Sequence, residues 1–256
     1  MIRKLETKEY QKVIDLASEV LTKETDGGWS QKGGESVLSF LKERIHKFAC
    51  IGSFYRRRIN GTAVYDPQTF RLILLIVRKE NREKGIGTEL LDAVITEAKE
   101  QNISKITVNA AKNAVMFYEK YGFERDGEET TAGELTFTLM EYLIGKEYLG
   151  KTVTVIIDHP YGSMNLRNPD VLNPVNYGYV EENITAEDRE FQEAYVCGPQ
   201  EPLEKFTGIV VGIIYHRNDS SSRWVVVPAG MTVDHNAIIQ TVAFEEQYYE
   251  TRFIWA

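Results

Sequence analysis

The chain has 256 residues, of which 43% are hydrophobic and 27% charged, and this composition is typical of a globular protein with one large or two modest domains. Its longest uninterrupted apolar run, Leu72–Val77, is far too short to span a bilayer, and two cysteines are too few for a disulfide framework. The N-terminus carries charge but no apolar signal region behind it, so we expect a cytoplasmic protein with no membrane partner.

The two halves of the chain differ in charge. Residues 1–145 contain 22 Lys plus Arg and 22 Asp plus Glu, whereas residues 146–256 contain 8 and 16, so the whole net charge of −8 lies in the second half. Phosphate backbones are bound by basic surfaces. We therefore expect no nucleic-acid partner.

Apolar periodicity predicts the elements of the first half in the order β-α-α-β-β-β-α-β-α-β. Strands are expected at residues 1–6, 49–54, 62–65, 72–77, 105–111 and 135–144. Helices are expected at residues 8–21 and 36–48, after the Gly85/Gly87 pair, and just before Gly122. Ser36 is the expected N-cap of the second helix.

A basic, glycine-containing turn joins the strand at 72–77 to the helix that follows it. The first N–H groups of a helix lack intrahelical partners, and the helix dipole adds positive potential there. Gly85 and Gly87 carry no side chains that would keep a diphosphate from the backbone, and Arg82 and Lys84 add positive charge. The turn therefore predicts a site for a phosphate-bearing, nucleotide-like ligand, although a Gly-x-Gly pair alone more often serves turn geometry. The spacing of glycines in this turn matches neither the P-loop motif nor the dinucleotide-binding fingerprint.

A second motif follows about thirty residues later, where Phe117-Tyr118 lies on a short helix that ends at Gly122-Phe123. Together the two motifs resemble the GNAT family of N-acetyltransferases, over residues 1–144. The resemblance implies an α/β GNAT fold with a mixed central sheet. It also implies acetyl-CoA as the donor and a small-molecule or peptide amine as the acceptor.

The resemblance also implies roles for individual residues. Main-chain groups near Ile76 and Val77 are expected to hold the pantetheine arm of acetyl-CoA. The pyrophosphate is expected on the turn residues Arg82, Lys84, Gly85, Ile86, Gly87 and Thr88. Tyr118 is expected to point at the thioester sulfur and to protonate the departing thiolate, while the alternative is an aromatic side chain that only packs beside Phe117.

One position departs from the family pattern. Many relatives carry an Asn seven residues before the tyrosine to hold the pantetheine arm, and Ala111 stands there in this chain. Asn109 is the favoured substitute. Asn113 is the other candidate, and it could equally be a plain N-cap.

The two early helices and the loop between them frame the acceptor pocket in this family, which makes residues 26–34 the expected specificity region. Trp29 either contacts the acceptor or anchors the loop on the core. Glu35 and Asp26 are candidates for the general base by location alone.

From residue 146 onward the chain shows short β-rich segments separated by turns, which predicts a small β-barrel. Strands are expected at residues 152–157, 195–196, 208–215 and 224–227, and a closing helix at 237–244. The predicted domains are therefore residues 1–144 and 146–256.

The second half resembles soluble inorganic pyrophosphatases and their small bacterial relatives, which implies an OB-type five-stranded barrel. Asp188, Glu190 and Glu193 match the acidic motif that binds Mg²⁺ in those enzymes, although acidic clusters are often only solvated surface. Other catalytic positions are replaced, by Thr154, Ile156 and the Ser221-x-Arg223 pair. We therefore expect this half to retain the barrel fold but not the hydrolytic activity.

The leading hypothesis is an acetyl-CoA-dependent N-acetyltransferase with a degenerate pyrophosphatase-like domain. One alternative is a Mg²⁺-dependent hydrolase of pyrophosphate or phosphoesters whose first domain senses CoA. Another is a non-catalytic barrel that serves oligomerisation, as in a homodimer.

Overall fold

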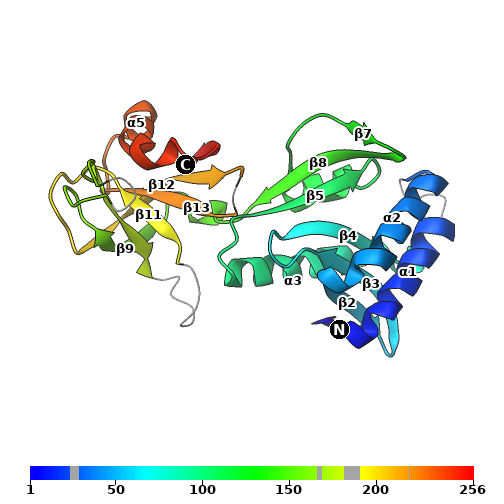
Figure 1. Cartoon of the computed structure of the whole chain (residues 1–256). Coiled ribbons are helices and arrows are strands. Elements are labelled where there is room, and N and C mark those ends of the chain that lie inside the picture. The colour runs from blue at the N-terminus through cyan, green and yellow to red at the C-terminus, as the bar shows by residue number, and fades with distance from the viewer. Residues whose placement is uncertain (24–28, 166–168, 182–190, 219) are drawn as a thin grey trace. The chain divides into compact units, whose positions relative to one another are not determined.

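The computed structural model describes residues 1–23, 29–165, 169–181, 191–218 and 220–256 (Figure 1). The chain divides into two compact units. The first contains Met1–Lys99 and Lys105–Leu143, and the second contains Glu100–Ser104 and Ile144–Ala256. Within the described ranges, no helix is both long and apolar enough to cross a membrane. Cys50 and Cys197 are buried free thiols.

The first unit is built on a mixed β-sheet with the strand order β1-β2-β3-β4-β5-β8-β6, and β7 pairs with β8. The strands are β1 (Ile2–Lys4), β2 (Ala49–Tyr55), β3 (Arg58–Tyr65), β4 (Arg71–Val77), β5 (Lys105–Ala111), β6 (Glu124–Arg125), β7 (Thr130–Ala132) and β8 (Leu135–Leu143). The helices are α1 (Tyr10–Lys23), α2 (Gln31–Arg44), α3 (Ile86–Glu100) and α4 (Val115–Tyr121). The predicted order of elements is confirmed, with β6 and β7 as short additions.

Helices α1 and α2 pack their apolar sides on the strands β2 to β4, and together they form the main core of this unit. The buried residues of α1 recur at helical spacing, as the sequence predicted, and they are Val13, Leu16, Ala17, Val20 and Leu21. They meet buried residues of the sheet such as Leu74 and Ile76. This packing fixes the position of β4, which carries one side of the site described below.

Helix α2 begins five residues earlier than predicted. Its N-cap is Ser30, whose hydroxyl accepts a hydrogen bond from the Gly33 N–H at 3.0 Å, so the prediction of Ser36 as N-cap was wrong. The glycines at 33 and 34 suggested a loop, but they lie inside the helix, where a Cβ on Gly33 would lie 2.9 Å from the carbonyl oxygen of Glu134. A Cβ on Gly34 would lie 2.2 Å from the carbonyl oxygen of Leu21 in α1.

Strands β4 and β5 run parallel, but only the first residues of β4 pair, with the middle of β5. Arg71 pairs with Thr107 and Leu72 with Val108, and no further pair follows along the described strands. Along its other edge, β4 remains paired with β3 as far as Val77. The two strands therefore splay apart, and the edge of β4 that faces β5 is open from Ile73 onward.

The second unit is a closed five-stranded barrel with a sixth strand and a helix. Its elements are β9 (Thr152–His159), β10 (Asn176–Val180), β11 (Glu193–Val196), β12 (Lys205–His216), β13 (Ser222–Val227), β14 (Thr251–Trp255) and α5 (His235–Glu246). The strands follow the order β13-β11-β10-β9-β12, and β12 also pairs with β13, which closes the ring. The long strand β12 can do this because its first residues pair with β9 and its later residues pair with β13 and β14.

The four predicted strands and the closing helix of this unit are present, whereas β10 and β14 were not predicted as strands. Strand β10 contains Gly178, which is unfavourable in an isolated strand. In the barrel this glycine allows β9 to approach, because a Cβ there would lie 1.9 Å from the carbonyl oxygen of Ile156. The requirement for glycine is therefore set by a neighbouring strand that lies about twenty residues away in sequence.

Candidate active site

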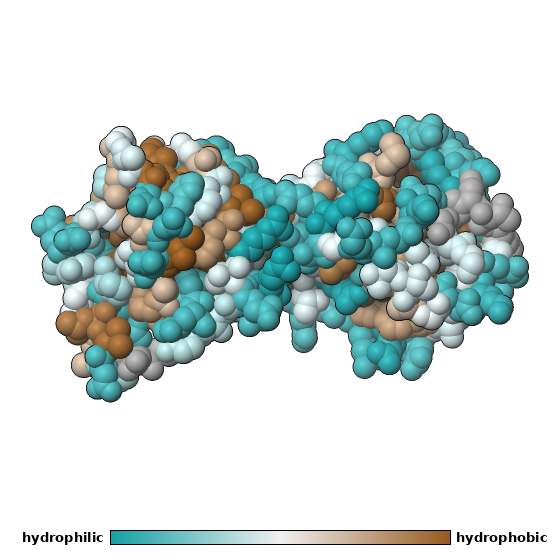
Figure 2. Space-filling model, turned by 90° about the horizontal axis from the view of Figure 1, so that it is seen from above, coloured by the Kyte–Doolittle hydropathy of each residue, from teal (hydrophilic) through white to brown (hydrophobic). Residues whose placement is uncertain are grey.

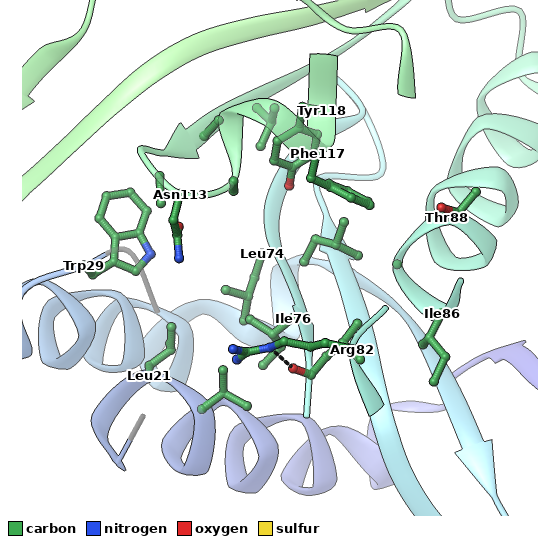
Figure 3. Close-up of a pocket in the computed structure, with 18 of the residues that line it drawn as sticks. Leu21, Trp29, Leu74, Ile76, Arg82, Ile86, Thr88, Asn113, Phe117 and Tyr118 are labelled. Atoms are coloured by element: carbon green, nitrogen blue, oxygen red, sulfur yellow. Dashed lines mark hydrogen bonds between the residues drawn. The ribbon is translucent and has the colours of Figure 1, made fainter. Parts of the chain in front are cut away.

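A pocket of about 590 Å³ lies in the first unit, beside the splayed strands β4 and β5 (Figure 3). This volume is within the range of small-molecule sites. It is bounded by the open edge of β4, the turn before α3, the end of β5 and helix α4. Its lining residues include Val20, Leu21, Trp29, Ile73 to Val77, Asn81 to Glu83, Gly85 to Thr88, Val108 to Ala111, Asn113, Ala114, Phe117 and Tyr118.

The turn at residues 78–85 ends in the open N-terminus of α3. The first intrahelical bond runs from the Glu89 N–H to the Gly85 carbonyl, so the N–H groups of residues 85 to 88 have no partner within the helix. These groups border the pocket, and the positive end of the helix dipole lies there too. The structure thus leaves these N–H groups without helical partners at the turn that the sequence singled out, and their binding of an anion stays a prediction.

The two glycines of the turn serve different purposes. Gly85 has φ +80°, a left-handed conformation that disfavours a side chain, although a Cβ there would meet no atom within 4 Å. Gly87 is helical, and a Cβ there would come within 3.1 Å of the Phe117 ring. Gly87 therefore also makes room for Phe117, a wall of the pocket that sequence reasoning missed.

Backbone groups of β4 point into the pocket at alternate residues. The Arg78 N–H donates to the Asn60 carbonyl in β3, so Arg78 faces β3 and its neighbour Val77 faces the open edge. By the same alternation Leu75 faces the open edge, while the main chain of Ile76 faces β3. Of the two residues expected to present their main-chain groups here, Val77 does so. Ile76 lines the pocket, but its main-chain groups face β3.

The two basic residues of the turn lie in different places. The Arg82 side chain is half-buried, extends across the pocket, and donates from Nε to the Val77 carbonyl at 3.1 Å (Figure 3). Lys84 is exposed, is absent from the pocket lining, and donates from Nζ to the Glu80 carbonyl at 2.6 Å. Lys84 thus contributes charge near the turn rather than a wall of the pocket.

Tyr118 lies on α4 with its ring buried between two aromatic neighbours and its hydroxyl directed into the pocket (Figure 3). Its ring meets those of Phe117 and Phe123 edge-on, at centroid distances of 5.3 and 5.1 Å. Gly122, at φ +112°, ends the helix as predicted. Burial raises the pKa of Tyr118 well above its usual value, so the hydroxyl stays protonated at neutral pH. Tyr118 therefore packs in the core and also faces the pocket, and its role in the reaction stays a prediction.

Both candidate asparagines line the pocket. Asn109 lies on β5 opposite Leu139, and Asn113 follows the end of that strand. Ala114 is the N-cap residue of α4, so the reading of Asn113 as a plain N-cap was wrong. Ala111, which takes the place of the family asparagine, also lines the pocket and offers only its main chain and a methyl group.

Trp29 and Leu21 lie toward the end of the pocket away from Thr88 (Figure 3). Trp29 packs on the core cluster and also lines the pocket, so it both anchors and borders the site. Glu35 is exposed on α2 and accepts from Gln31 Nε2 at 3.2 Å, outside the pocket, and Asp26 lies outside the described residues. The carboxylate found among the described lining residues is Glu83, in the turn.

Residues 34–144 match the family model of the acetyltransferase (GNAT) domain. The chain contains a GNAT acetyltransferase domain. By enzyme class the protein is therefore an acyltransferase. The matched residues include the turn before α3, the end of β5 and Tyr118, so the lining of the pocket belongs mainly to this domain.

The GNAT domain is also similar to solved structures. A GCN5-related N-acetyltransferase from Rhodopseudomonas palustris is 18% identical, with a TM-score of 0.49, over 56% of this chain and 95% of that one. A GNAT-family acetyltransferase from Staphylococcus aureus is 18% identical, with a TM-score of 0.46, over 56% and 98%. The PaiA N-acetyltransferase from Thermoplasma acidophilum, solved with coenzyme A, is 23% identical, with a TM-score of 0.46, over 56% and 98%. Among curated proteins no sequence matches the chain.

Beyond the GNAT domain, the barrel contains a buried polar network centred on Arg223. Its guanidinium donates to Glu246 Oε1 at 2.7 Å and to Glu193 Oε2 at 2.9 Å. Glu246 also accepts from the Tyr195 hydroxyl at 2.7 Å and lies 2.9 Å from His216 Nε2. The charge of Arg223 is thus neutralised inside the protein.

The predicted Mg²⁺ ligands fall only partly within the described residues. Asp188 and Glu190 lie outside them, and Glu193 is paired with Arg223. In the parts of the chain that the structure describes, no three His, Cys, Asp or Glu side chains are arranged to hold a metal ion. The magnesium site therefore stays a prediction.

Proposed function

We propose that this protein is an N-acetyltransferase that binds acetyl-CoA in the pocket beside β4 and transfers its acetyl group to an amine. The observation that carries the proposal is the open N-terminus of α3 at one end of that pocket, with Tyr118 on its wall. In this proposal the diphosphate binds the N–H groups of residues 85 to 88, with Arg82 beside them. The predicted division into domains at 1–144 and 146–256 is retained as part of it.

The pantetheine arm would then lie along the open edge of β4. Its amides need hydrogen-bonding partners when they are taken out of water, and the main-chain groups of Leu75 and Val77 on that edge can supply them. The thioester would reach the Tyr118 hydroxyl, with Asn109 or Asn113 nearby. The amine would enter at the end that Trp29 and Leu21 border.

Transfer requires a neutral amine to attack the thioester carbonyl, which builds negative charge on oxygen and then expels a thiolate. A buried hydroxyl that remains protonated can donate a hydrogen bond to the sulfur as charge develops on it. Because the pKa of Tyr118 is raised, its contribution is greater as a hydrogen-bond donor than as a complete proton donor. Amine acceptors are found by screening a panel of small amines and peptides for the release of free thiol.

The direct test is binding of acetyl-CoA to the full chain by isothermal titration calorimetry. We expect saturable binding with a dissociation constant of tens of micromolar or tighter, and a higher melting temperature with the ligand. The absence of both effects at about 1 mM acetyl-CoA would reject the proposal.

Replacing Gly85 by Ala tests whether the turn is the diphosphate site. The strain of a side chain at φ +80° costs about 1 kcal/mol and shifts the exposed N–H groups, so we expect acetyl-CoA to bind about fivefold more weakly. Gly133→Ala is the matched control, since Gly133 has φ +61° and equally open surroundings in the β7–β8 turn. It should lower stability similarly and leave the dissociation constant unchanged. An equal loss of affinity in both variants would argue against the turn.

For the second unit, the observations favour a role in association over hydrolysis, because the Arg223 charge is neutralised internally. Its surface shows patches of hydrophobic residues among hydrophilic ones, on the left in Figure 2. Met164 and Leu172, which pair through an isolated bridge, are 58% and 62% exposed. Contiguous exposed apolar side chains are typical of protein-interaction sites.

We accordingly expect the full chain to elute as a dimer in size-exclusion chromatography with light scattering. Met164→Lys/Leu172→Lys should convert it to a monomer that binds acetyl-CoA as before. A monomeric wild-type protein at about 100 μM would contradict this role. Release of phosphate from pyrophosphate with Mg²⁺ would instead favour the hydrolase alternative.

A further inference from the structure

The side chain of Arg82 lies where a donor must bind. The next two residues of the turn, Glu83 and Lys84, are exposed, yet Arg82 is half-buried and extends across the pocket toward the end where Leu21 lies (Figure 3). Its Nε donates to the Val77 carbonyl at 3.1 Å. That carbonyl belongs to the open edge of β4, which the proposed function assigns to the pantetheine arm.

Arg82 and a pantetheine amide therefore compete for the same acceptor. A hydrogen bond from a charged guanidinium is about twice as strong as one from a neutral amide. A donor that offers only amides must break the stronger bond to form a weaker one. A donor that also carries a diphosphate offers the guanidinium a better partner, because phosphate oxygens can accept two parallel hydrogen bonds from arginine.

The position of Arg82 allows this exchange. It lies three residues before Gly85, at the start of the segment whose N–H groups face the proposed diphosphate site. The exchange that we infer needs only a change in the side-chain conformation of Arg82, because its backbone already belongs to the turn that leads to Gly85. The neighbouring cation, Lys84, is bonded to Glu80 outside the pocket and cannot substitute.

We propose that Arg82 selects the donor class: it closes the β4 edge against acyl thioesters without a diphosphate and releases that edge when a diphosphate binds. This inference rests on the proposed binding of acetyl-CoA. It makes the protein specific for coenzyme A thioesters over thioesters of pantetheine alone, although both carry the same reactive group.

The test compares acetyl-CoA with S-acetylpantetheine, which lacks the diphosphate and the nucleotide. Both are measured by calorimetry on the full chain, the weaker ligand by competition. In Arg82→Ala we expect acetyl-CoA to bind about tenfold more weakly, because its diphosphate loses a charge-assisted hydrogen bond from Arg82. We expect S-acetylpantetheine to bind about tenfold more tightly, because it no longer has to break the hydrogen bond between Arg82 and Val77. A purely structural role of Arg82 would weaken both ligands. A purely diphosphate-binding role would leave S-acetylpantetheine unchanged.

Two further variants complete the design. Arg82→Met keeps the unbranched apolar part of the side chain without the hydrogen-bond donors of the guanidinium, and it should also bind S-acetylpantetheine more tightly than wild type does. Lys84→Ala removes a charge from the same turn and should leave S-acetylpantetheine unchanged. If neither Arg82 variant gains affinity for S-acetylpantetheine, or if Lys84→Ala gains as much, the inference is overturned while acetyl-CoA binding stands. If the wild type does not bind acetyl-CoA, the proposed function fails as well.

Discussion

Replacing Tyr118 by Phe should lower kcat about 100-fold while leaving the dissociation constant for acetyl-CoA within about twofold. The size follows from the usual contribution of a positioned proton or hydrogen-bond donor to a rate. Affinity should survive because the phenyl ring keeps the edge-on contacts with Phe117 and Phe123. The measurement is steady-state release of CoA with an acceptor from the amine screen, together with calorimetric titration of acetyl-CoA.

The matched control is Tyr121→Phe on the same helix. The Tyr121 hydroxyl donates to Asp92 and does not border the pocket, so its loss should leave kcat unchanged. Because burial holds the pKa of Tyr118 above its usual value, wild-type activity should show no decline from ionisation of this group up to about pH 10. An unchanged kcat in Tyr118→Phe would reject its role in the reaction.

Replacing Glu246 by Gln should destabilise the barrel by about 2 to 3 kcal/mol. This is less than the full cost of leaving a buried charge without a partner, because Arg223 keeps its bond to Glu193. Glu246 is 5% exposed and forms hydrogen bonds with Arg223, Tyr195 and His216. Water therefore cannot reach these partners to compensate for the lost charge. Hydrogen exchange of the full chain should show faster exchange in β12 and β13 and an unchanged rate in β2 to β5. Equal protection of β12 in both proteins would contradict the prediction.

The control for this variant is Glu181→Gln, which breaks the exposed pair with Lys205 and should cost less than about 1 kcal/mol of stability.

Low pH should destabilise the barrel, as Glu246→Gln does. Burial by itself raises the pKa of Glu246, but the hydrogen bond to His216 and the charge of Arg223 outweigh it, so the net shift is downward. A carboxylate with a lowered pKa stabilises the fold above the pKa of an unfolded glutamate, about 4.3, and loses this contribution as the pH falls below it. The barrel of Glu246→Gln should lack this part of the acid sensitivity.

The order of elements in the first unit could be predicted because each depends on local pattern. The helix at α1 repeats apolar residues on one side, and Gly122 ends α4 in the conformation that glycine favours. The start of α2 could not be predicted, since Gly33 and Gly34 give the same local signal in a loop and in a helix whose surroundings are tightly packed. Strand β10 was missed for a related reason, because Gly178 is required by β9 and not by its own neighbours.

For the candidate site, the sequence by itself determined the turn before α3 and the short helix that carries Tyr118, because backbone conformation and helix ends are local properties. Only the tertiary structure decided which groups face the pocket. The alternation of β4 turns Val77 rather than Ile76 to the open edge, and the direction of the side chains separates Arg82 from Lys84. In the barrel, Arg223 meets Glu246 across 23 positions, and no spacing rule within one element predicts a pair of that kind. Such contacts depend on how strands and helices pack, since burial and pairing are properties of several segments at once.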